Sequence, residues 1–494
     1  MAGGGSIDSY PQKLAYTAHV HIKLPVIIQG GMGAGVSHWS LAKAVSKLGQ
    51  LGVVSGTALD HILARRLQDG DPEGHIRRAL SHFPWQKTAR RILDTYFIPG
   101  GRKPNEPYRH ARMHVVEGEQ VSQALCIAGN FVEIFLAREG HSNPVGINYL
   151  EKIQIPHLPS LYGAMLAGCA VVIVGAGIPL EFPAAIEALA NHQPATYTVQ
   201  LAGGQNGAAT CQLAFDPTLF QEELALPPLE RPQFLPIVSS DALAMILCKK
   251  VKGTIDGFII EGPLAGGHNA PPRGALKLTE DGQPIYGPRD TVDLETMRQL
   301  GKPFWLAGSY GSPERVREAL AAGASGVQVG TPFALCVESG LAPEFRRALL
   351  QKALAGAARV FTDPLASPTG FPFKVAELEG TLSVQDVYES RRRVCDLGFL
   401  RTPYRKPDGS VGYRCAAEPE ASFLLKGGKP TDIAGRKCLC NALIANVGMP
   451  QQFANGSTEL PLITLGDDYA NIGRFCDANH LDFTAADVVR TLLG

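Results

Sequence analysis

The chain has 494 residues, of which 45% are hydrophobic and 19% charged, so a large core is expected and general disorder is excluded. The 46 Lys and Arg residues equal the 46 Asp and Glu residues in number, which gives no support for a nucleic-acid or anionic-membrane partner. No secretory signal pattern opens the chain, and no unbroken apolar stretch approaches the roughly 18 residues of a membrane span. With ten cysteines in this setting, we expect a cytoplasmic protein without disulfides.

From residue 23 onward, short apolar segments alternate with helical patterns. The expected strands are residues 25–29, 51–55, 144–148, 170–175, 234–238, 257–261, 304–307 and 326–329. Helical patterns follow most of them, for example at residues 39–48 and 313–322. Eight such units predict an α/β protein whose parallel strands close into a (β/α)₈ TIM barrel. A doubly wound open sheet is the alternative architecture.

Several segments depart from this rhythm. Residues 1–22 are polar and mixed, and we expect an N-terminal arm there. Residues 57–142 are too long for one connection and predict a helical insertion within a barrel that spans residues 23–360. A smaller insertion, residues 196–232, begins like a hairpin. Residues 361–494 have a composition of their own and predict a C-terminal accessory region.

Glycine-rich loops follow three of the expected strands. Residues 29–33 (QGGMG) follow the first strand, where the missing Cβ atoms let the backbone approach a flat ligand. Residues 307–311 (AGSYG) and 328–331 (QVGT) follow the last two strands, the usual phosphate site of barrels. Tight turns without a ligand are the alternative. Because neither a P-loop nor a GxGxxG after a strand is present, we expect no triphosphate loop and no Rossmann site.

The sixth expected strand ends in residues 261–269 (EGPLAGGHN). His268 follows paired glycines there, at the end of the barrel where active sites are built. Imidazole is the side chain best suited to proton transfer near neutral pH. A surface-loop histidine is the alternative, but the position of His268 after this strand predicts a catalytic role.

Together these segments resemble the nitronate monooxygenase (2-nitropropane dioxygenase-like) flavoproteins and their relatives, the FMN-dependent enoyl-acyl-carrier-protein (enoyl-ACP) reductases. The resemblance follows the family's order through residues 27–33 (IIQGGMG), 146–148 (GIN), 174–177 (VGAG), 261–268 (EGPLAGGH) and 326–333 (GVQVGTPF), with Glu338 and Ser339 shortly after. It implies FMN as the cofactor and His268 as the histidine beside the flavin that acts on the substrate.

The same resemblance implies which residues hold the cofactor. The residues that match the isoalloxazine contacts are Gly30, Gly31, Met32, Asn148 and Gly175. Those that match the ribityl-phosphate site are Gly267, Gly308, Ser309, Gly311, Gly330 and Thr331. The family usually has an acidic residue at the position of Leu264 and Gly at the position of Ser309. These departures and the extra segments indicate a reshaped substrate pocket.

The resemblance implies an FMN-dependent oxidoreductase, and three functions stay open. The leading one is oxidation of alkyl nitronates with O₂, in which His268 takes the proton α to the nitro group or holds the anionic nitronate. The alternative is an NAD(P)H-dependent enoyl-thioester reductase, in which His268 protonates the α-carbon. A non-catalytic FMN-binding protein is the third. The expected partner is a small-molecule or acyl-thioester substrate, with no nucleic acid and no membrane, and a homo-oligomer stays open.

Four cysteines lie close together in the C-terminal region: Cys395, Cys415, Cys438 and Cys440. Four thiolates suit a tetrahedral zinc ion or an iron–sulfur cluster, and basic residues nearby would offset their charge. The intervals are irregular, however, and residues 438–440 do not form the usual CxxC. Since buried free cysteines are also common core residues, a metal site and plain core cysteines are both open.

Overall fold

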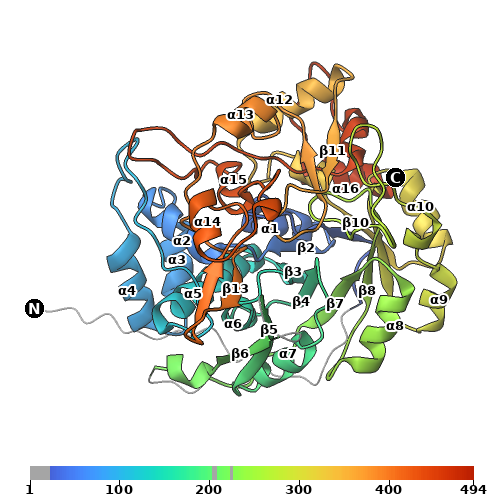
Figure 1. Ribbon diagram of the computed structural model, residues 1–494. Helices are drawn as coiled ribbons and strands as arrows, with labels where there is room; N and C mark the ends of the chain where they lie inside the picture. The colour runs from blue at the N-terminus through green and yellow to red at the C-terminus, as the bar shows by residue number, and fades with distance from the viewer. Residues whose placement is uncertain (1–22, 203–208, 223–225) are drawn as a thin grey trace, which may run out of the picture.

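The computed structural model describes residues 23–202, 209–222 and 226–494, so the expected arm at residues 1–22 lies outside the described residues. Eight parallel strands form one sheet in the order β1-β10-β9-β8-β7-β4-β3-β2 (Figure 1). The strands are β1 (Ile27–Gln29), β2 (Gly52–Ser55), β3 (Val145–Leu150), β4 (Val171–Gly175), β7 (Gln233–Val238), β8 (Phe258–Glu261), β9 (Phe304–Ala307) and β10 (Gly326–Val329).

The sheet closes on itself between its two outermost strands. Ile28 of β1 forms a parallel bridge with Leu51, the residue before β2. The Gln29 amide donates to the Leu51 carbonyl at 2.9 Å, and the Leu51 amide donates to the Ile27 carbonyl at 3.1 Å. The predicted (β/α)₈ barrel is therefore confirmed, and every expected strand is present within two residues of its expected ends.

Among the described residues, twelve α-helices lie between the barrel strands or follow β10 before the C-terminal region: α1 (Trp39–Lys47), α2 (Leu59–Gln68), α3 (His75–Ser81), α4 (Gln86–Tyr96), α5 (Gln120–Arg138), α6 (His157–Leu166), α7 (Phe182–Ala190), α8 (Asp241–Lys250), α9 (Leu294–Gln299), α10 (Pro313–Ala321), α11 (Thr331–Ala334) and α12 (Pro343–Leu354). Hydroxyl caps start two of them: Ser240 accepts from the Leu243 amide at α8, and Ser312 accepts from the Arg315 amide at α10. Such caps satisfy amides that the first helical turn leaves unpaired.

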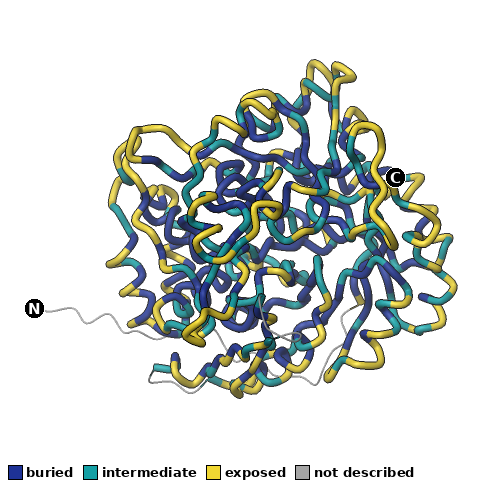
Figure 2. Tube along the Cα trace, in the orientation of Figure 1, coloured by how far each residue is buried: buried dark blue, intermediate teal, exposed yellow. Residues whose placement is uncertain are grey.

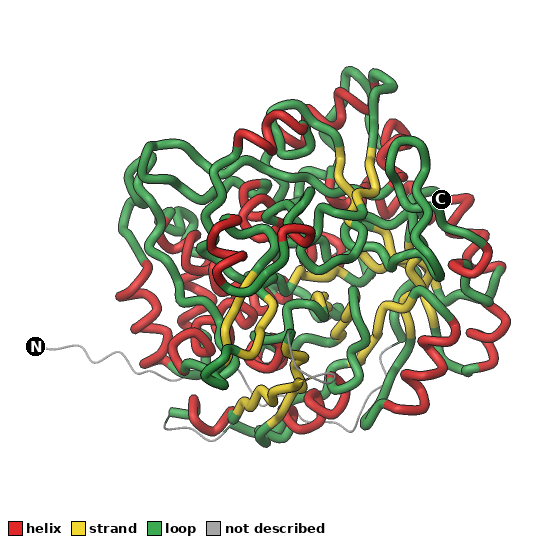
Figure 3. Tube along the Cα trace, in the orientation of Figure 1, coloured by secondary structure: helices red, strands yellow, loops and turns green. Residues whose placement is uncertain are grey.

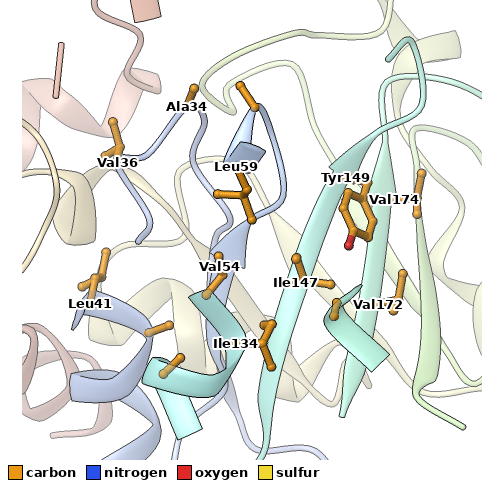
Figure 4. Packing of buried hydrophobic residues seen from close by; sticks show 14 of the residues in the cluster. Ala34, Val36, Leu41, Val54, Leu59, Ile134, Ile147, Tyr149, Val172 and Val174 are labelled. Carbon is orange, nitrogen blue, oxygen red and sulfur yellow. The ribbon is translucent and has the colours of Figure 1, made fainter. Parts of the chain in front are cut away.

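The strands alternate between two buried layers, as a period of two requires. Along β4, Val171 and Ile173 pack inside the barrel, whereas Val172 and Val174 belong to the outer layer. Figure 4 shows Val172 beside Ile147 of β3, with Ile134 of α5 against the same layer. Both faces of the sheet are thus covered, which is why the strands read as continuous apolar runs.

Residues 57–142 hold α2, α3, α4 and α5, on the left of Figure 1. α5 is the one described helix long and apolar enough to cross a membrane, but 72% of its most apolar window is buried inside the protein. It packs against α1, α6 and β3. α5 is therefore a core helix of the barrel's outer ring, and the domain boundary at residues 57–142 stays a prediction.

The smaller insertion begins with an antiparallel hairpin, β5 (Ala195–Leu201) and β6 (Ala209–Phe215). The C-terminal region contains β11 (Val360–Asp363), β12 (Phe373–Ala376), α13 (Gln385–Ser390), β13 (Thr402–Arg405), β14 (Val411–Arg414), α14 (Glu420–Leu425), α15 (Leu439–Ala445), the 3₁₀ helix η4 (Asp467–Arg474) and α16 (Ala485–Leu493). Figure 3 shows that loops connect these short elements across much of the region.

The C-terminal region packs on the barrel. Its residues Leu439, Leu462 and Leu465 belong to the same buried cluster as the outer layer of the barrel. In Figure 1 the orange and red segments lie over the upper side of the barrel, and in Figure 2 their inward stretches are buried. The loop that carries His268 is held by this region, since His268 bridges Phe373 of β12.

Candidate active site

One cavity opens at the carboxyl ends of the barrel strands, under the C-terminal region. Loops after β1, β3, β4, β8, β9 and β10 line it. Every residue that the sequence assigned to the site is among its lining residues: Gly30, Gly31, Met32, Asn148, Gly175, Gly267, His268, Gly308, Ser309, Gly311, Gly330 and Thr331. Residues separated by up to 300 positions thus meet in one place, while their individual roles stay predictions.

Three polar side chains in this cavity have buried atoms without a partner among the described residues. They are Asn148 Oδ1, Ser309 Oγ and Gln328 Oε1. The Asn148 side-chain nitrogen is bonded, because Nδ2 donates to the Gly31 carbonyl at 3.2 Å. A buried polar atom left unpaired costs about 1–3 kcal/mol, so these atoms suit a polar ligand that fills the cavity. Gln328 was not predicted as a site residue, although it lies in the motif at residues 328–331.

The loop after β9 keeps a glycine-like backbone even where the side chain is not glycine. Gly308 has φ +102° and Ser309 has φ +59°, both in the left-handed region. Residues other than glycine rarely adopt that backbone region. Ser309 therefore keeps the backbone conformation that the family's usual glycine would take. Gly330 differs, because its φ is −109° and the nearest atom to an added Cβ is Met32 Sδ at 3.6 Å. Gly330 therefore has a φ that other residues also adopt, and its missing side chain leaves space in the cavity beside Met32.

His268 is half-buried and is held by two residues of the C-terminal region. Its Nε2 lies 2.7 Å from Ser367 Oγ, which in turn lies 2.8 Å from Thr369 Oγ1. The Phe373 ring meets the imidazole edge-on, with the centroids 4.8 Å apart. Burial, with a smaller contribution from the Lys152 charge, lowers the pKa of His268 to about 4. The imidazole is therefore neutral at pH 7, so one ring nitrogen can accept a proton and the other can donate a hydrogen bond.

Glu261 places a carboxyl group in the same cavity, at the carboxyl end of β8. Burial raises the pKa of Glu261 to about 8. At neutral pH this side chain is mostly a protonated acid that can donate a hydrogen bond or a proton. The sequence placed Glu261 at a strand end but did not single it out, because a raised pKa depends on burial that only the fold creates.

Residues 464–468 of the C-terminal region cover the part of the cavity predicted to hold the phosphate. Thr464 Oγ1 accepts from the Gly267 amide at 2.8 Å, and Thr331 Oγ1 accepts from the Gly466 amide at 2.9 Å. The Thr331 hydroxyl keeps its own proton free to donate to a ligand. The Asp468 carboxylate also lines this part, and Arg474, 3.6 Å away, offsets its negative charge.

Comparison with known families identifies the second half of this barrel. Residues 231–364 match the nitronate monooxygenase family model, from just before β7 through β11. Over these residues the chain is similar to the nitronate monooxygenase family. The matched segment includes Glu261, His268 and both loops of the predicted phosphate site. The predicted resemblance and the predicted class, an FMN-dependent oxidoreductase, are confirmed by this match.

Several solved structures are similar to the chain at low identity. FabK from Thermotoga maritima is 16% identical with a TM-score of 0.48, covering 96% of this chain and 92% of its own. Nitroalkane oxidase from Streptomyces ansochromogenes is 15% identical with a TM-score of 0.42, covering 94% and 96%. The enoyl reductase domain of MlnA from the macrolactin biosynthesis cluster of Bacillus amyloliquefaciens is 12% identical with a TM-score of 0.37, covering 75% and 69%. None of the curated proteins matches the chain in sequence.

Proposed function

We propose that the protein binds FMN in the barrel cavity and oxidises alkyl nitronates with O₂, in the cytoplasm. The observation that carries this proposal is His268: a neutral imidazole, inside the matched family domain, that faces a cavity lined with unpartnered polar atoms. When bound, FMN supplies the electron-transfer chemistry. The chain supplies binding, orientation and proton handling around it.

The residues present fit FMN. The loop at Gly30–Met32, with Asn148 and Gly175, would hold the ring, and the unpartnered atoms of Asn148 and Gln328 are free to bond its polar edge. Gly267 and Gly330 leave open space, and Ser309 Oγ is unpartnered beside them, as a ribityl-phosphate chain requires. Residues 464–468 would then keep water away from the phosphate end.

For a substrate that arrives as the neutral nitroalkane, the chain has one proton to move. A neutral His268 can accept the proton α to the nitro group, since its lowered pKa leaves Nε2 or Nδ1 unprotonated. Ser367 orients the ring by bonding Nε2. For a substrate that arrives as the nitronate anion, the same imidazole donates an N–H to it and no proton is removed.

Glu261 favours a second candidate, NAD(P)H-dependent reduction of an enoyl thioester. That reaction needs an acid that protonates the α-carbon, and Glu261 is a protonated carboxyl in the cavity at neutral pH. In this candidate the neutral His268 donates a hydrogen bond to the thioester carbonyl, and Glu261 supplies the proton. The two candidates use the same cavity and differ in which substrate reduces the flavin.

An anaerobic titration of the purified yellow protein separates the candidates. NADPH, a primary alkyl nitronate and crotonyl thioester are added separately while the flavin absorbance is followed. Bleaching by the nitronate but not by NADPH is the expected result. Bleaching by NADPH, with colour restored by crotonyl thioester, would establish the reductase instead. A flavin that none of these reagents reduces or reoxidises would point to a non-catalytic FMN-binding protein.

A further inference from the structure

The four cysteines of the C-terminal region surround one small cavity. Cys395, Cys415, Cys438 and Cys440 all line it. They come from three separate places in the fold: the loop after α13, the residue after β14, and the start of α15. Packing therefore brings together four thiols whose irregular sequence intervals could not show whether they share one site.

The four thiols surround one enclosed space. Cys415 and Cys438 are buried, and all four cysteines line the same cavity. Packing therefore places the four sulfurs in one group.

Cations stand beside these thiols. Arg391 interacts with Cys438 while it pairs with Glu459. Arg401 lines the cavity, and its guanidinium donates to the carbonyls of Gly398 at 3.1 Å and His114 at 2.7 Å rather than to a described carboxylate. Arg401 is half-buried, and the Glu418 carboxylate lines the same cavity, so the positive charge of Arg401 acts on both this carboxylate and the thiols. A nearby positive charge favours ionised thiols, as metal-bound thiolates are.

The spacing of the sulfurs favours a cluster over a single zinc ion. Zinc holds thiolates at about 2.3 Å in a tetrahedron, which brings the sulfurs within about 4 Å of one another. Among the described residues, the only three ligand atoms that lie within 4.8 Å of one another belong to Asp60, His114 and Cys126. No three of the four cysteine sulfurs are that close. In a four-iron cluster each thiolate binds a different iron, so the sulfurs stand farther apart than around one zinc ion.

We propose that Cys395, Cys415, Cys438 and Cys440 ligate an iron–sulfur cluster. The cavity that holds it adjoins the predicted FMN cavity, because Leu400, Leu439 and Cys440 line both. Arg391 and Arg401 offset the negative charge of the thiolates. The proposal concerns ligation only and is independent of which substrate the barrel uses.

The test uses the full chain, purified without oxygen and reconstituted with ferrous iron and sulfide. After desalting, iron, zinc and acid-labile sulfide are measured per chain, and the dithionite-reduced protein is examined by low-temperature EPR. We expect about two to four irons with equal sulfide, and an EPR signal that broadens on warming as cluster signals do. Substoichiometric iron after reconstitution, or zinc in its place, would overturn the proposal.

Two variants and one control assign the ligands. Cys415→Ser and Cys438→Ser should each lose most of the iron and sulfide. Cys476→Ser is the matched control, because Cys476 is also buried in the C-terminal region but bonds the Ile472 carbonyl away from the cavity. Iron retained by both site variants contradicts the assignment.

Alkylation of the wild-type protein tests the same four ligands without requiring that any cysteine variant folds. The four thiols should resist iodoacetamide in the reconstituted protein and react after the iron is removed with a chelator. Peptide mass mapping reads each cysteine separately. If the four thiols react equally with and without iron, they do not hold a cluster.

Discussion

The barrel and the C-terminal region contribute different things to one cavity. The barrel loops present backbone and unpartnered polar atoms to the space itself, as Asn148 and Ser309 do. The C-terminal region lines the cavity too, largely with apolar side chains such as Phe399 and Leu443, and it also presents groups that hold the barrel loops: Ser367 bonds His268, and Thr464 bonds the Gly267 amide. The predicted polar ligand contacts thus lie on the barrel and the positioning groups on the region that covers it, so substitutions in the two should differ in kind.

Removing the imidazole should have the largest effect. His268→Ala is expected to keep FMN and to lower turnover about 10²- to 10⁴-fold, the usual contribution of a positioned acid or base. Steady-state kinetics on the substrate identified by the titration measure the loss. His141→Ala is the control, because His141 is also half-buried but bonds the Ala137 carbonyl at the end of α5. A loss under about tenfold would remove His268 from the catalytic role.

Filling the predicted phosphate space should abolish cofactor binding. Gly330→Val is expected to weaken FMN affinity at least about tenfold, or about 1.4 kcal/mol, because a branched side chain beside Met32 occupies that space. The backbone at φ −109° accepts valine, so the fold should persist. Flavin content and circular dichroism measure the two effects. Gly287→Val is the control, since φ is −128° there and an added Cβ meets nothing within 4 Å. Equal flavin content in both variants would contradict the placement.

A positioning residue should matter less than the group it positions. Ser367→Ala removes the hydroxyl that bonds His268 and should lower kcat/KM about 3- to 10-fold, the worth of one hydrogen bond of about 0.5–1.5 kcal/mol. Ser367→Thr should restore most of the activity, since it returns the hydroxyl. A loss as large as that of His268→Ala, or no rescue by threonine, would show that Ser367 does more than orient the ring.

The effect expected at Glu261 is on the pH dependence of stability rather than on turnover. The folded pKa of about 8 lies above the ordinary value of 4.5, so between these values the folded state binds more protons than the unfolded state. Its contribution to stability is present below pH 4.5 and is lost as pH rises toward about 8. Glu261→Gln should therefore flatten the fall in melting temperature between pH 5 and 8. If the dependence of melting temperature on pH is the same in the variant, the Glu261 carboxyl is more solvated and its pKa is not raised.

Whether a feature could be predicted from the sequence depends on how far apart in the chain its interacting residues lie. The strands were predictable because burial on both faces makes each one a local apolar run, and the loops at residues 29–33 and 307–311 were predictable because they follow strands directly. His268 was found for the same reason. Its partner Ser367 was not, because 99 positions separate the two residues and nothing local in the sequence pairs them.

The same limit applies to the four cysteines and to residues 464–468. The cysteines were noticed as a group, but their intervals could not distinguish a shared cavity from separate core positions. Thr464 and Gly466 lie in a loop without a motif, and they become part of the site only through hydrogen bonds to Gly267 and Thr331. Predicting them requires the tertiary packing of the C-terminal region.

The cover formed by residues 464–468 also bears on the order of events during synthesis. All eight barrel strands leave the ribosome before this segment does, since β10 ends at Val329. A barrel that folds before this segment emerges would lack the hydrogen bonds to Thr464 and Gly466, and its predicted phosphate loops would be uncovered. Docking of residues 464–468 would then be the step that closes this end of the cavity.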